Sequence, residues 1–213
     1  VPGRYVIFAT RKGTVKKTAL EEYANPRPSG IIAINLDDDD EVIGVRLTNG
    51  DSEVILSTRE GQAIRFRETD ARPMGRATAG VRGIQLDAGD SVVAVDVVDP
   101  SATLLAASEN GYGKRTAMDA YRLTRRGGKG IISVKTTERN GPAVGFLQVR
   151  DEDEIMLMAA QGKVLRCKVD DIREIGRNTQ GVRLLDMDGD EDRVVAVVRL
   201  VEREEGVPEE GES

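Results

Sequence analysis

The sequence has no histidine, no tryptophan and one cysteine among its 213 residues. Without histidine, neither a Ser-His-Asp nor a Cys-His catalytic arrangement can be built, and the usual Cys/His zinc sites are excluded. A single cysteine forms no internal disulfide, which fits a reducing compartment. Because Cys167 lies in a stretch of alternating apolar and basic residues, we expect its side chain to be a small buried hydrophobe.

Long apolar runs and aromatic residues are also scarce. No run approaches the roughly 18 apolar residues that a membrane helix needs, and the apolar run at residues 6–9 is too short for a signal peptide. Aromatic residues make up 3% of the chain, too few for a platform that stacks single-stranded bases. These absences favour a cytoplasmic protein.

The net charge of −6 is unevenly distributed. Residues 202–213 hold six Glu and one Arg, a net charge of −5, which leaves −1 for the rest of the chain. We expect residues 203–213 to form an acidic, disordered tail, since such a composition cannot bury a core. For the remaining residues, the placement of charge is more informative than its total.

An internal repeat of about fifty residues organises the chain. It divides into segments 5–50, 53–101, 103–153 and 154–202, each opening with an apolar run that leads to a glycine. The first glycines of the four repeats are Gly13, Gly61, Gly111 and Gly162, and the second glycines are Gly30, Gly80, Gly130 and Gly181. Four residues after each first glycine stands a cation: Lys17, Arg65, Arg115 or Arg166.

Each repeat reads as four short strands, which in the second repeat span residues 53–57, 62–67, 80–86 and 91–98. The first glycine suits a tight turn. The second strand alternates, so one of its faces is wet, whereas the first and fourth are almost continuously apolar, as in strands buried on both faces. We therefore predict an all-β, propeller-like array of four-stranded antiparallel blades, in which neighbouring blades stack. Helical periodicity is weak, and its best candidate is residues 18–23.

The connections differ in charge. The turns at 37–40, 87–90 and 188–192 are acidic. The loop before the second glycine is basic, and we expect these loops to gather on one rim, apart from the acidic turns. One alternative is that turns are simply polar. The basic residues of these loops are Arg27, Arg76, Arg125, Arg126, Lys129 and Arg177.

The sharpest local motif is Arg-Arg-Gly-Gly-Lys-Gly at residues 125–130. Its glycines expose N–H donors and let a phosphate backbone approach, while the cations supply charge. A nucleotide-binding P-loop needs Ser or Thr after the lysine, and Gly130 stands there instead. The acidic turn beginning at Asp186 fails as a calcium loop, because Glu191 and Val197 replace the required Gly and Glu.

The repeats and this motif together resemble the C-terminal domain of the bacterial DNA gyrase A subunit, from Tyr5 to about Val201. Residues 13–18, 110–117 and 176–182 are characteristic of that family. The resemblance implies a β-pinwheel, a ring of about six blades that exchange strands, whose basic rim wraps duplex DNA. Together with the repeated basic positions, it predicts DNA contacts at Arg125, Arg126, Gly127, Gly128, Lys129, Gly130, Lys16, Lys17, Arg27, Arg65, Arg76, Lys114, Arg115, Arg166 and Arg177.

The resemblance also implies a non-catalytic role in negative supercoiling. ATP and Mg²⁺ would act through other regions of the parent topoisomerase, with no cofactor or metal in this chain. The partners would be double-stranded DNA, the rest of gyrase A, and gyrase B in an A2B2 enzyme of the bacterial nucleoid. The family's signature motif, a box of sequence Gln-Arg-Arg-Gly-Gly-Lys-Gly, normally lies in the first blade. Here a near-copy lies in the third repeat and begins with Thr124. Two interpretations remain open: this motif is the principal box, or it is a secondary box.

Two other functions remain as alternatives. The C-terminal domain of topoisomerase IV has the same architecture but degenerate boxes, so the intact motif at residues 125–130 favours gyrase. A propeller that binds protein is disfavoured by the repeated cations and by the scarcity of aromatic anchors.

The acidic tail generates a first prediction. Its charge can occupy the basic rim in place of phosphate, so deleting residues 203–213 should tighten binding to duplex DNA at low salt. The effect should shrink at high salt, where both interactions are screened. Mobility-shift titrations at two salt concentrations measure it, and an unchanged affinity at low salt would make the tail a passive solubilising segment.

Overall fold

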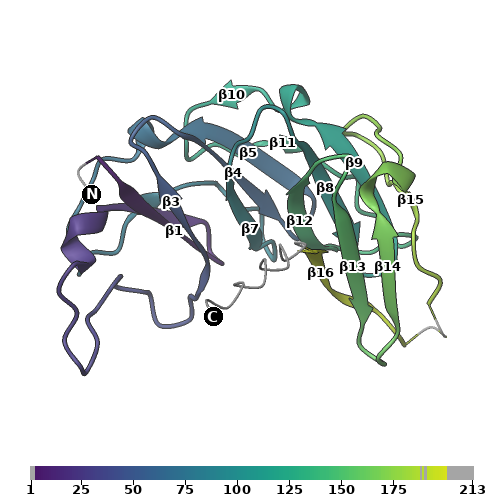
Figure 1. The fold of residues 1–213 in the computed structure, drawn as a ribbon, viewed down its shortest axis with the longest axis horizontal. Coiled ribbons are helices and arrows are strands. Elements are labelled where there is room, and N and C mark those ends of the chain that lie inside the picture. Colours follow the sequence, from purple (N-terminus) through teal and green to yellow (C-terminus); the bar gives the residue numbers. More distant parts are fainter. Residues whose placement is uncertain (1–2, 188, 190, 201–213) are drawn as a thin grey trace, which may run out of the picture.

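The computed structural model describes residues 3–187, 189 and 191–200. Four small, mainly antiparallel sheets follow one another along an arc (Figure 1), and the only helices in the described residues are four short 3-10 turns. The expected all-β array of stacked blades is confirmed. The tail at residues 203–213 and part of the acidic turn at 188–192 lie outside the described residues.

Each repeat supplies three long strands to its own blade. The first strands are β1 (Tyr5–Thr10), β4 (Glu53–Thr58), β8 (Thr103–Ser108) and β13 (Glu154–Ala159). The second strands are β2 (Thr14–Ala19), β5 (Gln62–Arg67), β9 (Tyr112–Ala117) and β14 (Val164–Lys168). The last strands are β3 (Val42–Thr48), β7 (Val92–Val97), β12 (Ala143–Val149) and β16 (Val194–Leu200).

Every second strand ends in a 3-10 turn: η1 (Leu20–Tyr23), η2 (Glu68–Asp70), η3 (Met118–Ala120) or η4 (Val169–Asp171). In each blade the first strand is central, with the last strand of the repeat on one side and the second strand on the other. The last strands line the inside of the arc, and the second strands face its outer edge (Figure 1).

The outermost strand of a blade comes from the following repeat. β6 (Val81–Arg82) pairs with β2, β11 (Ile131–Ile132) with β5, and β15 (Val182–Arg183) with β9. This is the strand exchange that the family resemblance implies. The third strand expected at residues 80–86 is wrong in length and location, because only two residues pair and they pair with the preceding blade.

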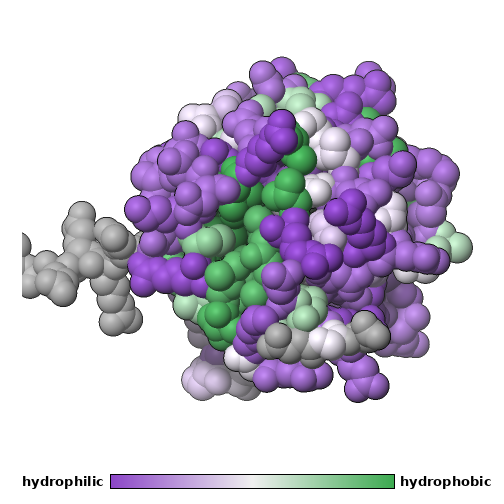
Figure 2. Space-filling model, turned by 90° about the vertical axis from the view of Figure 1, so that its right-hand side faces the viewer, coloured by the Kyte–Doolittle hydropathy of each residue, from purple (hydrophilic) through white to green (hydrophobic). Residues whose placement is uncertain are grey.

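The first blade is complete, because β6 of the second repeat pairs with β2, but the two ends of the described array still differ from its middle. In the first repeat, residues 31–36 form no strand, and Ile32 is 61% exposed. Among the described residues, the last blade has three strands, and its end face displays an apolar band (Figure 2). Val164 in β14, and Val195 and Val198 in β16, are exposed. Among the described residues, residues 31–36 have no preceding blade with which to pair, and no exchanged strand pairs with β14.

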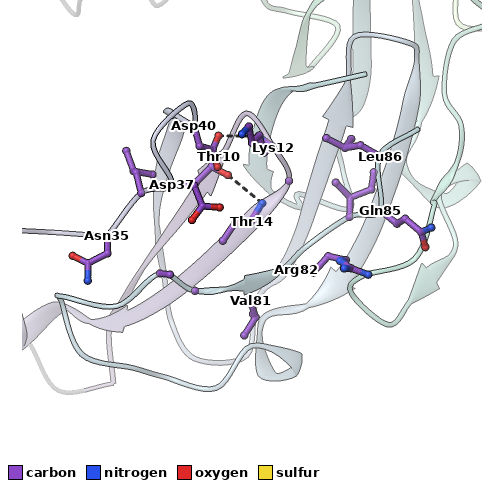
Figure 3. Close-up of a pocket in the computed structure, with 15 residues that line it drawn as sticks. Thr10, Lys12, Thr14, Asn35, Asp37, Asp40, Val81, Arg82, Gln85 and Leu86 are labelled. Carbon is purple, nitrogen blue, oxygen red and sulfur yellow. Dashed lines mark hydrogen bonds between the residues drawn. The ribbon is translucent and has the colours of Figure 1, made fainter. Parts of the chain in front are cut away.

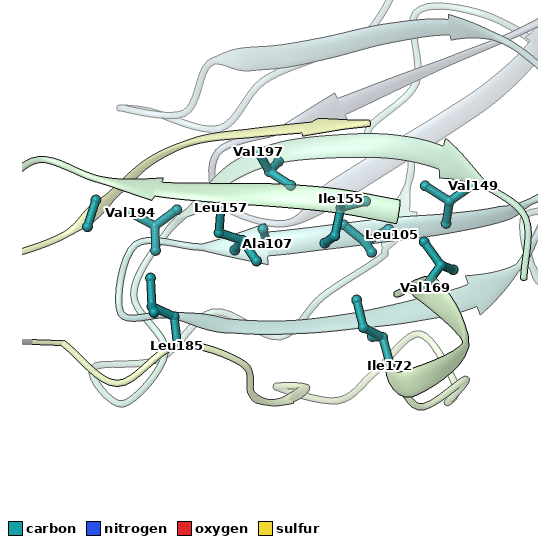
Figure 4. Close-up of a cluster of buried hydrophobic side chains, with 11 residues drawn as sticks. Leu105, Ala107, Val149, Ile155, Leu157, Val169, Ile172, Leu185, Val194 and Val197 are labelled. Carbon is teal, nitrogen blue, oxygen red and sulfur yellow. The ribbon is translucent and has the colours of Figure 1, made fainter. Parts of the chain in front are cut away.

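The core lies between blades. First-strand side chains alternate between the two neighbours: Ile55 packs towards the third blade, whereas Val54 and Leu56 pack towards the first. In the same way Leu105 and Ala107 meet the fourth blade (Figure 4). This two-sided burial explains the continuous apolar run of the first strands. The last strands differ from expectation, because most β7 residues are only half-buried.

Cys167 is half-buried at the edge of the core between the third and fourth blades. The expected full burial is wrong, because β14 is an edge strand of the three-stranded blade. Burial nevertheless raises the pKa of the Cys167 thiol, and the nearby Asp171 and Glu154 raise it further.

Gly61 shows how the exchange constrains a turn. It has a φ of 83°, in the region that favours glycine. Its carbonyl accepts hydrogen bonds from the N–H groups of Ser133 (2.8 Å) and Val134 (3.1 Å), in the third repeat. A Cβ at this position would collide with the carbonyl of Val134. The turn glycine therefore also provides the room in which the next repeat docks.

This geometry predicts different losses of stability for alanine substitutions at two turn glycines, Gly61 and Gly162. Gly162 has a φ of 92°, but nothing lies within 4 Å of the position that a Cβ would take, so Gly162→Ala should cost only the left-handed backbone penalty of about 1–2 kcal/mol. Gly61→Ala should cost roughly 2 kcal/mol more, because it also displaces the exchanged strand. Denaturant or thermal unfolding of both variants tests this, and equal losses would contradict the docking role of Gly61.

Candidate nucleic-acid interface

The basic loops of the second, third and fourth repeats each lie on the outer edge of the preceding blade. In the third repeat, β10 (Leu123–Thr124) runs parallel to β5, residues 125–130 form the loop, and β11 returns antiparallel to the same strand. Single parallel bridges place the equivalent segments beside β2 (Lys17 with Pro73) and β9 (Arg115 with Glu174). The expected clustering of these loops along one edge therefore follows from strand exchange (Figure 1).

One arginine in each of three loops holds adjacent repeats together. Each donates through its guanidinium to a backbone carbonyl of the preceding repeat: Arg76 to Ile32 (3.0 Å), Arg126 to Arg82 (3.0 Å) and Arg177 to Ile132 (2.8 Å). Backbone bonds reinforce the junctions, from Asn35 to Thr78, Gln85 to Gly128 and Lys135 to Thr179. These three arginines are thus structural as well as basic.

The second-strand cations are all engaged with carboxylates. The pairs are Lys17–Glu68 at 2.8 Å, Arg65–Glu53 at 2.6 Å, Arg115–Asp151 and Arg166–Glu154. Arg65 also donates to the carbonyls of Met118 and Tyr121, and Arg115 to that of Ile172. The Lys17 and Arg115 side chains are 4% and 9% exposed, whereas that of Arg166 is 61% exposed. The repetition of these cations suggested a row of DNA contacts. In at least three repeats, the cation instead helps to hold the blade together.

Glu68 shows how such a charge is held inside the protein. Its side chain is fully buried and accepts hydrogen bonds from Thr48 Oγ1 (2.8 Å) and from the N–H groups of Gly50 (2.9 Å) and Ser52 (2.6 Å). Burial alone would raise the pKa of Glu68, but the Lys17 ammonium and these donors outweigh it and lower the pKa below its usual value. The Glu68 carboxylate therefore stays ionised at neutral pH.

Two of the predicted cations are buried lysines that fix a basic loop. Lys16 Nζ donates to the carbonyl of Ala33 (2.6 Å) and to that of Arg76. In the third repeat, Lys114 Nζ donates to the carbonyl of Gly176 (2.8 Å), to that of Arg177 and to Thr179 Oγ1 (3.0 Å). Burial lowers the pKa of Lys114 to about 8, and nearby Arg177 lowers it further.

The second and fourth repeats have apolar residues, Ile64 and Leu165, at the position of these lysines. The loop at residues 125–130, which lies on the blade of Ile64, therefore has no lysine beneath it. Arg126 Nε instead donates to the carbonyl of Asp70 (2.8 Å), and the N–H of Gly127 donates to the carbonyl of Gly83 (2.6 Å).

Arg125 and Lys129 are the exposed cations of this loop. Arg125 has no side-chain hydrogen bond or ion pair with any described residue, whereas Lys129 Nζ lies 2.8 Å from Asp87 Oδ1. Asp87 belongs to an acidic turn. The expected separation of basic loops from acidic turns is therefore wrong at this position, because strand exchange brings the turn of one repeat beside the loop of the next.

Three exposed arginines were missed by the sequence reasoning. Arg72, Arg122 and Arg173 each stand eleven residues after the first glycine of their repeat, at the point where the chain crosses to the preceding blade. The signal was available, since their spacings equal those of the glycines. These arginines lie outside both the first-glycine turn and the glycine-rich loop, which are the parts of the repeat that stand out in the sequence.

A hollow of about 550 Å³ lies beside the first-repeat turn (Figure 3). Lys12 and Arg82 line it, together with Asp37 and Asp40, so its charges are balanced. Asp40 Oδ1 accepts the N–H of Lys12 (2.9 Å) and thereby braces the turn. Within residues 3–187, 189 and 191–200, no group of three or more His, Cys, Asp or Glu could hold a metal ion.

The family model for the DNA gyrase C-terminal domain, a β-propeller, matches residues 4–49, 52–99, 102–150 and 153–200. The chain belongs to this family. It is 48% identical to the Escherichia coli DNA gyrase A protein over 200 residues, which is 94% of this chain and 23% of that protein. It is 43% identical to the Staphylococcus epidermidis gyrase A protein, with the same coverage. The chain thus spans about a quarter of the length of these relatives.

Two solved structures have the same architecture. A DNA gyrase A C-terminal domain aligns with a TM-score of 0.84 and 31% identity, covering 94% of this chain and 67% of that one. A topoisomerase IV C-terminal domain aligns with a TM-score of 0.87 and 31% identity, covering 93% and 62%. The fold is therefore shared across both enzymes. None of the helices among the described residues has the length and apolarity needed to cross a membrane.

The buried lysine of this gyrase-family domain gives a testable consequence. Lys114→Met removes the donor that satisfies two carbonyls, and should destabilise the fold by about 2 kcal/mol. The folded pKa of about 8 lies below the unfolded value of 10.5. Between these pH values the unfolded chain binds more protons, so wild-type stability should rise relative to that of Lys114→Met as pH increases.

Unfolding measured from pH 7.5 to 10 gives both quantities. Lys129→Met is the matched control, because Lys129 is an exposed lysine, and should change stability by less than about 0.5 kcal/mol. A wild-type to Lys114→Met difference that stayed constant with pH would contradict the buried position of this ammonium.

Proposed function

We propose that this domain binds duplex DNA along the outer edge of its arc and bends it, as the C-terminal part of a gyrase A protein. The observation that supports the proposal best is the placement of three basic loops, from the second, third and fourth repeats, on the outer edge of the preceding blade, one loop per junction. Membership of the gyrase C-terminal domain family points to the same role.

Fewer residues are available for contact with DNA than the sequence suggested. Arg27, Arg125 and Lys129 are exposed, as is Gly128, and they are the first choice for phosphate contacts. Arg76, Arg126, Gly127, Gly130 and Arg177 shape the loops and can present remaining N–H groups. Arg166 is the exposed member of the second-strand row, while Lys16, Lys17, Arg65, Lys114 and Arg115 support the blades from inside.

Binding of this kind would depend on shape and charge rather than on base sequence. No helix suitable for a major groove is present in the described residues, where the helices are 3-10 turns of three or four residues. Side chains on a convex edge that neutralise phosphates one after another would favour a duplex curved around that edge.

The remainder of the role belongs to the parent protein. We propose that this region is non-catalytic and holds no cofactor, while ATP, Mg²⁺ and the strand-cleaving chemistry act elsewhere in an A2B2 gyrase. The wrapped DNA would favour negative supercoiling. We place the enzyme in the bacterial cytoplasm, at the nucleoid.

A topoisomerase IV domain is the second candidate, supported by its equally close structural alignment. The intact residues 125–130 and the 48% identity to gyrase A favour gyrase. Supercoiling by the parent enzyme would decide, since the gyrase proposal requires negative supercoils from relaxed DNA.

The loop at residues 125–130 provides the direct test. Arg125→Ala with Lys129→Ala removes up to two phosphate contacts and leaves the structural Arg126 in place, so the slope of log K against log salt should fall by roughly 2. The fold should persist, because both side chains are exposed. Duplex binding at several salt concentrations measures the slope.

The matched control is Arg46→Ala with Arg150→Ala, which removes the same charge from exposed residues at the inner side and one end of the blades. Gly128→Thr is a second probe. Thr78 and Thr179 occupy the equivalent positions, and a Cβ at Gly128 meets only Ile64 Cδ1 at 3.8 Å, so the fold should tolerate the substitution. Equal binding losses in the loop and control variants would argue against a special role for the loop.

A further inference from the structure

Three rows of repeated cations run along this domain, and the structure gives them different roles. The row four residues after the first glycines is paired with carboxylates. The row of Arg76, Arg126 and Arg177 is bonded to carbonyls of the preceding repeat. The third row, Arg72, Arg122 and Arg173, has neither kind of partner among the described residues, although all three side chains are exposed.

The backbone of the third row is fixed in space by strand pairing. The residue after each arginine pairs in parallel with the second strand of the preceding blade: Pro73 with Lys17, Leu123 with Arg65, and Glu174 with Arg115. Each arginine therefore occupies the same place on three successive blades, on the outer edge where the chain enters its loop. The side chain itself remains free to adapt.

We propose that Arg72, Arg122 and Arg173 form a continuous track of phosphate contacts for the DNA backbone, one on each of the first three blades, and that Arg122 lies beside the loop at residues 125–130. This inference rests on the proposed function and deepens it. A guanidinium without a protein partner is available for a bidentate phosphate contact, and its repetition at a fixed place in successive blades matches a ligand whose charge repeats along its length.

The track has an uneven charge environment. Asp170, Asp171 and Glu174 flank Arg173 in sequence, whereas Arg122 has only Asp119 nearby in sequence. Carboxylates close to a phosphate weaken its binding. Arg122 should therefore contribute more than Arg173, a ranking that a solely structural or solubilising role would not produce.

The test compares two triple variants of the whole chain. Arg72→Ala with Arg122→Ala and Arg173→Ala should lower the salt slope of duplex binding by roughly 2 to 3. The control, Arg46→Ala with Arg150→Ala and Arg199→Ala, removes the same charge from arginines that pair with Asp96, Asp99 and Asp153. Arg46 and Arg199 lie in β3 and β16, on the inner side of the arc.

The control should lower the slope by less than about 1. Circular dichroism and thermal melting should be unchanged for the track variant, because no described residue loses a partner. The three-lysine variant, Arg72→Lys with Arg122→Lys and Arg173→Lys, keeps the charge and should restore most of the slope. Among single alanine variants, Arg122→Ala should weaken binding more than Arg173→Ala.

The outcomes separate the two proposals. Wild-type binding with equal slopes for the track and control variants would overturn the track and leave DNA binding intact. Absence of salt-dependent duplex binding by the wild-type chain would overturn the proposed function and the track with it. A track variant that binds more weakly but has an unchanged salt slope would also count against phosphate contacts at these arginines.

Discussion

The exchange of a short strand between successive repeats is the constraint on which the other features depend. A repeat cannot complete its own blade, because the two-residue strand that follows its second glycine pairs with the blade of the preceding repeat. To reach that edge the chain must cross between blades and turn back, and the crossing is the basic loop. The connection that supplies the last strand of a blade therefore also places cations on the outer edge of that blade.

Buried charge stabilises this arrangement in a way that an apolar core alone would not. The exchanged segments contribute only two paired residues each, so much of the junction rests on donors that reach backbone carbonyls, such as Lys114 to Gly176 and Arg126 to Arg82. A buried ammonium or guanidinium that satisfies several carbonyls fixes the direction of a loop. The cost is desolvation, seen in the lowered pKa of Lys114.

Odd and even repeats differ in the residue that stands three positions after the first glycine, so the basic loops rest on different side chains. Loops from the second and fourth repeats rest on Lys16 and Lys114, whereas the glycine-rich loop of the third repeat rests on Ile64. This loop has no lysine beneath it, and Gly128 is exposed where Thr78 and Thr179 of the neighbouring loops are half-buried. This difference gives a physical basis for treating residues 125–130 as a separate kind of contact.

The sequence by itself determined the repeat, the all-β class, the turn at each first glycine and the family, because each is encoded by local spacing: apolar runs, glycines and motif residues recur at fixed intervals. It also located the basic loops. Only the tertiary structure decided which cations face solvent. Lys17 and Arg122 look alike as repeated cations in sequence, yet Lys17 meets a buried Glu68 from the next repeat, while Arg122 has no partner among the described residues. Burial and pairing depend on residues brought together from other repeats by strand exchange, and that information is not local in the chain.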